Sequence, residues 1–513
     1  MTHDELVALS ATDMRRMIGS KAISPVELMD ACISRIETLN PYVNAIAATD
    51  YDSARKNAQA AEQAVMRGMP LGLLHGLPTG IKDLEATAGL LTTHGSPMYR
   101  DAIPSEDNLL VSRLRAAGAI VVAKTNVPEL GAGANTRNPV WGATGNPFNP
   151  NLNAGGSSGG SAAALASDML PVCTGSDTGG SLRIPAALCG VVGFRPSPGL
   201  VPSPRKLLGW TPISVVGPMG RSVADARLQL AATAGLSDGD PLSYPTVARA
   251  FLDVTQIDLS SLRVGWTEDF DVCAVDDDIR RTFREKLATM APRFKSCEPI
   301  SVDFAEAHRA FDVIRAESFV AGLRSAYEKD PESLGANTRA NYEMGTMMTL
   351  ADAASAQNAQ TAMMRKFQRL YDQFDVIIAP TTPVSAFPWT TLFATHVGGE
   401  EQTNYYRWLA LTYVTTLCTN PAISLPCGLD QRGMPFGLQV IGPFREDRRT
   451  LDIAQALEYA FAQSASLCRP RPDIQMLKNA VISPPLKSIV TSPPSGSQSG
   501  VRPGTTHSGT SLV

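Results

Sequence analysis

The sequence predicts an α/β fold in which a central mixed β-sheet is flanked on both faces by helices. Helical patterns alternate along the chain with short apolar runs of strand length, as in layered α/β proteins. The 513 residues are 44% hydrophobic and 18% charged, a composition that supports a large core. The chain shows no internal repeat that would indicate a solenoid or a propeller.

The N-terminal part is predicted to form two helices followed by an irregular segment. Ser24-Pro25-Val26-Glu27 combines a capping box with a proline at the first helical position. The helix after it carries apolar residues at helical spacing, namely Met29, Cys32, Ile33, Ile36 and Leu39. Residues 52–66 form an alanine-rich second helix. In residues 74–84 (LHGLPTGIKDL), glycine and proline then interrupt the helical pattern.

The rest of the chain continues the alternation. Further strands are expected over residues 120–123, 171–174, 191–194, 262–266, 376–379 and 436–441. Further helices are expected over residues 107–117, 222–234, 277–290, 304–327 and 450–463.

The domain organisation follows from composition. Residues 1–475 are expected to form one domain. Within it, residues 269–371 are more charged and almost wholly helical, which suggests a helical cap over the sheet. Residues 386–408 are expected to form a loop rich in aromatic residues. Residues 483–513 are rich in serine, proline, glycine and threonine and are expected to be a disordered tail.

Composition also excludes several classes of function. The net charge is −4 without a long basic run, so neither nucleic acid nor a membrane surface is indicated as a partner. No apolar run approaches the roughly 20 residues that span a membrane, and the start MTHDELVALS lacks the apolar region of a signal peptide. The eight cysteines are scattered, so we expect no metal site, no disulfide framework and a cytoplasmic protein with reduced thiols.

Two runs of glycine and serine dominate the centre of the chain. Residues 155–167 read GGSSGGSAAALAS and residues 175–183 read GSDTGGSLR, so that Ser157 and Ser181 lie 24 residues apart. Glycine permits positive φ and close approach of other groups, and serines beside paired glycines indicate backbone N–H groups that surround a small anionic centre. We interpret the two runs as a site with a serine nucleophile.

Two other interpretations of these runs compete with the first. Neither run has the GxxxxGK[ST] spacing of a phosphate-binding loop, so nucleotide binding is disfavoured. GGSSG does fit the G-x-S-x-G pattern of α/β-hydrolases with Ser157 as nucleophile, which requires a downstream histidine. His308, expected on the surface in the middle of a helix, and His396, expected in a loop, are the candidates outside the tail.

A serine site that needs no histidine is also consistent with the sequence. A lysine can act as a base when it is neutral, and burial favours the neutral form because it lowers the pKa of the amine. Lys82 lies in the apolar, glycine-containing segment GLPTGIKDL and is the candidate for such a base.

Eight segments together carry a family resemblance. These are GLPTGIKDL, AKTNVPELG, GGSSGGSAAALAS, GSDTGGSLRIPAALCGVVGFRPS, GPMGRSVAD, IIAPTTP, NPAISLPCG and GLQVIGP. They resemble the amidase signature family, and the resemblance covers roughly residues 5–472. Within the family, the chain looks like aryl acylamidases and 6-aminohexanoate cyclic dimer hydrolases.

The resemblance implies a Ser-cisSer-Lys triad and a cleavage of amides through an acyl-enzyme. Ser181 is then the nucleophile, Ser157 the bridging serine in a cis peptide after Gly156, and Lys82 the base. The implied oxyanion hole consists of the backbone N–H groups of Thr178, Gly179, Gly180 and Ser181. No cofactor or metal is implied.

Neighbouring residues are expected to support the site. Ser158 is expected to cap the helix over residues 161–167 or to bond within the loop, and Asp177 is expected to pair with Arg183. Cys173 and Cys189 are expected in the core.

The substrate is predicted only by class. The acyl pocket is expected to involve Gly131, Ala132, Gly133, Ala134 and Asn135. The side of the pocket that holds the leaving group is expected to involve residues 316–342 and the aromatic loop 387–408. The aromatic side chains of that loop either pack within the protein or line the pocket. If they line the pocket, an aryl or apolar amide is the favoured substrate, and esters and carbamates are further candidates.

Other functions stay open on the sequence alone. The family also contains one component of a tRNA-dependent amidotransferase, its A subunit, but residues 315–327 (RAESFVAGLRSAY) depart from the pattern of that branch. A non-catalytic binding protein of the same fold is the third alternative. A homodimer is the candidate assembly.

Overall fold

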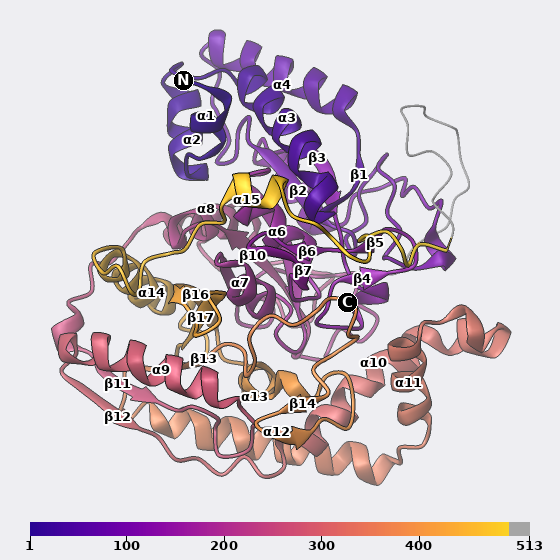
Figure 1. Cartoon of the computed structure of the whole chain (residues 1–513), viewed down its shortest axis with the longest axis vertical. Coiled ribbons are helices and arrows are strands. Elements are labelled where there is room, and N and C mark those ends of the chain that lie inside the picture. Colours follow the sequence, from indigo (N-terminus) through magenta and orange to yellow (C-terminus); the bar gives the residue numbers. More distant parts are fainter. Residues whose placement is uncertain (492–513) are drawn as a thin grey trace.

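A computed structural model of the chain describes residues 1–491 (Figure 1). Its centre is one mixed sheet of 11 strands in the order β1-β3-β2-β8-β10-β9-β16-β17-β13-β11-β12. The strands in chain order are β1 (Ile46–Thr49), β2 (Pro78–Lys82), β3 (Ile120–Thr125), β8 (Val172–Asp177), β9 (Val192–Arg195), β10 (Val215–Gly220), β11 (Arg263–Trp266), β12 (Ser296–Pro299), β13 (Val376–Pro380), β16 (Ala422–Leu429) and β17 (Pro435–Ile441). Strand β2 runs parallel to β3 and β8, whereas β8 and β10 are antiparallel, so the predicted mixed sheet is confirmed.

Fifteen α-helices accompany the sheet within the described part of the chain. The first eight are α1 (His3–Val7), α2 (Ala11–Gly19), α3 (Pro25–Val43), α4 (Tyr51–Met66), α5 (Leu109–Ala116), α6 (Gly159–Ala166), α7 (Arg183–Cys189) and α8 (Val223–Thr233). The others are α9 (Asp277–Met290), α10 (Ala307–Lys329), α11 (Ala336–Thr346), α12 (Leu350–Leu370), α13 (Ala410–Leu417), α14 (Asp447–Ala462) and α15 (Ile474–Lys478). None of these helices is long and apolar enough to span a membrane. Figure 1 shows α1–α4 and α9–α12 at opposite ends of the molecule.

Short two-stranded ribbons complete the secondary structure. They are formed by β4 (Arg137–Asn138) with β5 (Gly142–Ala143), by β6 (Gly145–Asn146) with β7 (Asn149–Asn153), and by β14 (His396–Val397) with β15 (Glu400–Glu401). The last ribbon lies inside the predicted loop at residues 386–408, most of which is irregular.

Most predicted elements are present with shifted ends. The capping box at Ser24 is confirmed, because its hydroxyl accepts hydrogen bonds from the N–H groups of Val26 and Glu27. Three interior strands, β2, β10 and β16, are not predicted from the sequence because they contain glycine and proline, residues that usually argue against a central strand. The segment expected to be irregular, residues 74–84, thus contains β2. Gly217 in β10 is needed there, since a Cβ atom would lie 2.6 Å from the carbonyl oxygen of Phe194 in the neighbouring strand.

Two of the expectations are wrong in part. The region 269–371 is not wholly helical, because β12 pairs in parallel with β11 as the edge strand of the sheet. An edge strand is half solvated and needs no apolar run, which is why its sequence SCEP carries no strand signal. The predicted tail begins too early: Leu486 is 5% exposed and packs with Ala143 and Trp389. Residues 492–513 of that predicted tail lie outside the described residues.

The elements that hold the two glycine-serine runs are completely buried. Every residue of α6 is buried, as is every residue of β8. Helix α6 can approach the sheet closely because it begins with two glycines, and a Cβ atom on Gly160 would lie 2.2 Å from the backbone nitrogen of Asn126. Small residues in α6 therefore set the depth at which the preceding loop, with Ser157, lies in the protein.

Candidate active site

The predicted base and the predicted bridging serine are in direct contact. Lys82 is the last residue of β2, and Ser157 lies in the loop before α6. The Nζ atom of Lys82 donates hydrogen bonds of 2.8 Å to the hydroxyls of both Ser157 and Ser176. The peptide bond between Gly156 and Ser157 is cis. Strands β2 and β8 are parallel neighbours, so their C-terminal ends bring Lys82 and Ser176 to the same edge of the sheet.

The environment of Lys82 favours a neutral amine. Its side chain is completely buried, and the removal of water lowers its pKa from 10.5 to about 7, against the attraction of Glu85 and Asp177. No carboxylate of the described chain forms an ion pair with this amine. At neutral pH, a substantial fraction of Lys82 therefore carries a lone pair that can accept a proton.

Ser181 lies in the turn that precedes α7 and lines a pocket together with Ser157, Ser176, Thr178 and Gly179. Its carbonyl oxygen accepts a hydrogen bond of 3.3 Å from the N–H of Ser158. The structure thus places the predicted nucleophile at the same opening as the lysine-bound Ser157.

The four predicted oxyanion donors are not equivalent. The N–H of Gly180 donates to a carboxylate oxygen of Asp177 at 2.9 Å and is therefore occupied, which corrects its assignment to the oxyanion hole. The N–H groups of Thr178, Gly179 and Ser181 have no acceptor among the described residues, and all three residues line the pocket. These three N–H groups can receive a negatively charged oxygen.

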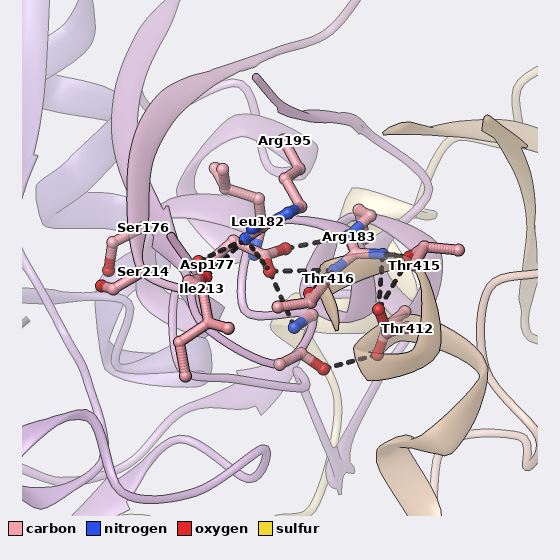
Figure 2. A network of polar contacts seen from close by, with 12 residues as sticks. Ser176, Asp177, Leu182, Arg183, Arg195, Ile213, Ser214, Thr412, Thr415 and Thr416 are labelled. Carbon is pink, nitrogen blue, oxygen red and sulfur yellow. Dashed lines mark hydrogen bonds and ion pairs between the residues drawn. The ribbon is translucent and has the colours of Figure 1, made fainter. Parts of the chain in front are cut away.

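A buried charge network holds the loop with Ser181 in place (Figure 2). Asp177 forms ion pairs with Arg183 at 2.9 Å and with Arg195 at 3.1 Å, and all three side chains are completely buried. Burial alone would raise the pKa of Asp177, but the two guanidinium groups hold it below its ordinary value, so the group is a carboxylate. Arg195 is not predicted as a site residue from the sequence, although the family segment GFRPS contains it.

The network also ties the loop to α13. The Arg183 guanidinium donates to the carbonyl of Thr412 at 2.9 Å and to the hydroxyl of Thr416 at 2.9 Å (Figure 2). The Thr412 hydroxyl in turn donates to the carbonyl of Gly179 at 2.6 Å. Gly180 has a φ of 125° and sits so close to Thr412 that a Cβ atom would lie 2.2 Å from its hydroxyl oxygen. Glycine is therefore required at position 180 both by the backbone conformation and by the lack of space for a side chain.

Several supporting residues have contacts that the sequence does not predict. Ser158 occupies the N-cap position of α6, but its side chain makes no capping hydrogen bond. Its hydroxyl instead accepts a hydrogen bond of 3.4 Å from the N–H of Ser176 in β8. Ser176 is a partner of Lys82 that the sequence does not predict, because a serine inside a buried strand offers no signal for that role. Cys173 and Cys189 are buried, as predicted.

The predicted acyl segment contributes only in part to the pocket. Gly131 and Gly133 line it. Ala132 and Ala134 are buried away from it, and the Asn135 amide donates to the carbonyls of Trp389 and Thr391. The rest of the pocket is lined by residues of three leucine-containing segments, of α10 and of the region around the aromatic loop, and by Ser214. These residues are Leu84, Leu130, Lys206, Leu207, Leu208, Ser214, Arg315, Ser318, Phe319, Tyr405 and Leu409.

The histidine candidates lie elsewhere. His308 is in the first turn of α10 and partly buried, not on the surface in the middle of a helix, and its ring contacts the Tyr413 hydroxyl and the Val272 carbonyl. His396 is exposed, and its ring lies 3.3 Å from the Thr395 hydroxyl. Within residues 1–491, the side-chain partner of the Ser157 hydroxyl is an amine and not an imidazole.

Comparisons with known proteins agree with this fold. Residues 27–451 match the family model described as Amidase. An acylamidase of Rhodococcus erythropolis is 32% identical over 471 residues, which cover 89% of this chain and 96% of that protein. The A subunit of the glutamyl-tRNA(Gln) amidotransferase of Acaryochloris marina is also 32% identical, over 89% of this chain and 98% of that protein.

Solved structures of amide hydrolases share this fold. A bacterial aryl acylamidase of the amidase signature family superimposes with a TM-score of 0.83 at 28% identity, over 88% of this chain and 96% of that chain. The 6-aminohexanoate cyclic dimer hydrolase, in complex with its substrate, gives 0.78 at 26% identity, over 91% of this chain and 99% of that chain. The fold and the matches define an amide-hydrolysing enzyme. The chain belongs to the amidase signature family.

Proposed function

We propose that this enzyme cleaves carboxylic amides through an acyl-enzyme on Ser181, with Ser157 relaying protons between Ser181 and Lys82. The observation that carries the proposal is the buried amine of Lys82, which contacts the Ser157 hydroxyl and has a pKa of about 7. A base whose pKa lies near the working pH is the one that transfers protons most efficiently.

The proposed acylation proceeds in three steps. Neutral Lys82 accepts the proton of the Ser157 hydroxyl, Ser157 accepts the proton of Ser181, and the Ser181 oxygen bonds to the amide carbon. The negative charge on the former carbonyl oxygen is held by the N–H groups of Thr178, Gly179 and Ser181. Loss of one such donor costs about 3–4 kcal/mol in related chemistry.

Collapse of this intermediate returns the proton. The relay delivers the proton to the amide nitrogen, the C–N bond breaks, and the amine leaves. A water molecule then gives its proton to the same relay and attacks the ester of Ser181, which releases the carboxylic acid and restores the serine.

For the substrate we propose an aryl or apolar amide, with esters and carbamates as further substrates. The leucines and Phe319 that line the pocket support an apolar group. The relatives named acylamidase and aryl acylamidase support the same class. We further propose that residues 1–475 act as a single catalytic domain. A homodimer and a cytoplasmic location stay predictions.

The test is a panel of anilides, aliphatic amides, p-nitrophenyl esters and carbamates. We expect turnover by the parent protein and loss of turnover in Ser181→Ala and Ser157→Ala variants that keep the parent's melting temperature. A fluorophosphonate probe should add its mass to the peptide that contains Ser181 and not to that peptide from Ser181→Ala. Full turnover by Ser181→Ala would refute the proposal.

A second candidate function is the A subunit of a tRNA-dependent amidotransferase complex, which is favoured by relatives named for that subunit at the same 32% identity. The different sequence at residues 315–327 speaks against it. If this alternative is correct, the chain co-purifies with a partner subunit of that complex.

A further inference from the structure

The charged residues that line the catalytic pocket all have the same sign. Lys206 and Arg315 line it, and no aspartate or glutamate of the described chain does. The remaining lining is neutral: leucines, glycines, serines, a threonine and two aromatic residues. A pocket with two cations and no carboxylate has a positive potential that attracts anionic ligands.

Arg315 is a buried cation without an anionic partner. It is 7% exposed, and it forms no ion pair with any residue in the described part of the chain. Its hydrogen-bond acceptors, the side-chain oxygens of Asn341 and Tyr405, are neutral. Buried charges in proteins are as a rule paired, so an arginine that lines a pocket in this state indicates a partner that arrives from outside.

The surroundings of Arg315 hold the guanidinium rigidly while they leave it unneutralised. Its central carbon lies 4.6 Å from the ring of Phe319, 4.8 Å from that of Tyr406 and 5.1 Å from that of Tyr405. Two acids lie within one helical turn of it on α10: Asp312 is bound to Arg407 at 2.9 Å, and Glu317 forms no ion pair with Arg315. Aromatic rings stabilise a cation without removing its charge, and the guanidinium is the group best suited to bind a carboxylate.

Lys206 adds a second positive charge from the loop before β10. Its amine donates to the backbone carbonyls of Thr211 at 2.7 Å and Ser214 at 3.3 Å. Asp240 attracts it but forms no ion pair with it. Burial lowers the pKa of Lys206 to about 8, so the amine is mostly charged at neutral pH.

We propose that the amide cleaved at this site carries a carboxylate, which binds to Arg315 while Lys206 adds to the positive field of the pocket. This inference rests on the proposed amide hydrolysis and narrows its substrate class to amides with an apolar part and an anionic end. The apolar part contacts the leucines of the pocket, and the anionic end replaces the missing partner of Arg315.

The test compares amides that differ only in charge. One pair, 4-acetamidobenzoate and 4-isopropylacetanilide, carries the group on the amine side. The other pair, succinanilate and 4-methylpentananilide, carries it on the acyl side. We expect kcat/KM to be at least 10-fold higher for the carboxylate in at least one pair. Equal rates, or a preference for both neutral compounds, would overturn the proposal.

Variants assign the preference to Arg315. In Arg315→Gln, the ratio of kcat/KM between carboxylate and neutral amide should fall by about 10- to 100-fold, the range for a lost charged hydrogen bond. Arg315→Lys should restore part of the ratio because it keeps the charge. An arginine with only a structural role would change both amides alike and leave the ratio unaltered, which would also overturn the proposal.

Two further variants keep the test independent of folding defects. Lys206→Met changes a residue in a loop and should lower the same ratio by a smaller factor. Arg324→Gln makes the matched change at an exposed position of α10 outside this pocket and should leave the ratio at the parent's value.

A binding measurement separates this inference from the proposed chemistry. Calorimetric titration of Ser181→Ala with the carboxylate and the neutral amide of each pair needs no turnover. We expect the carboxylate to bind at least 10-fold more tightly in the pair that shows the kinetic preference, and this difference should disappear in Ser181→Ala/Arg315→Gln. If the parent cleaves neutral anilides but Ser181→Ala binds both members of each pair equally, the proposed amide hydrolysis is retained and the carboxylate proposal is refuted.

Discussion

Replacement of Lys82 tests whether its amine must lose a proton. In Lys82→Arg the side chain keeps a positive charge and hydrogen-bond donors, but a guanidinium is not deprotonated in proteins. In Lys82→Met the volume is similar and no base is present. A positioned general base contributes about 100- to 10,000-fold to a rate, so we expect both variants to lose activity by a factor in this range at every pH.

The parent protein should show the titration that the variants lack. Because burial lowers the pKa of Lys82 to about 7, the neutral, active form increases as the pH rises through 7. Below that value, kcat/KM should fall about tenfold per pH unit, so that activity at pH 6 is roughly one tenth of the plateau reached above pH 8.

The assay is kcat/KM for a neutral anilide between pH 5 and 9, since such a substrate does not itself titrate in this range. Lys366→Arg, at a partly exposed lysine paired with Asp303, is the matched control and should retain the profile of the parent. Circular dichroism and melting temperature establish that each variant is folded. An active, folded Lys82→Arg, or a parent profile that is flat or falls from pH 5 to 8, would rule out the role of a neutral lysine.

Three further predictions concern stability. Gly180→Ala should lower the free energy of unfolding by about 1–3 kcal/mol, because φ is 125° and the new methyl group would overlap Thr412. The control is Gly433→Ala, where φ is 75° and the space around the residue is open. In the same urea titration, this variant should lose less unfolding free energy than Gly180→Ala. Asp177→Asn leaves two buried arginines without their carboxylate and should cost about 3–5 kcal/mol in urea unfolding; a loss below 1 kcal/mol would contradict the pairing. Leu486→Ala should cost about 2–5 kcal/mol by thermal melting if this residue belongs to the core, and nothing measurable if it belongs to a disordered tail.

The sequence predicted the elements whose signals are local. The capping box at Ser24 and the strand that contains Ile120 needed only neighbouring residues to be recognised. The interior strands β2, β10 and β16 were missed because glycine and proline serve close packing there, and such packing is invisible in a single segment. The Ser158 hydroxyl accepts from the N–H of Ser176, a contact that was not predicted because only the fold brings the two residues together.

The sequence by itself determined the alternating α/β architecture, the family, and the three residues proposed for catalysis, because each lies in a short motif of characteristic residues. Only the tertiary structure decided the burial, the hydrogen-bond partners and the charge pairing of the residues at the site. Burial moves the pKa of Lys82 to about 7, and Asp177 occupies the N–H of Gly180. Arg315, from a distant helix, faces the pocket without a counter-ion among residues 1–491. Desolvation and charge pairing depend on every group that surrounds a side chain, and those groups are assembled from segments far apart in the chain.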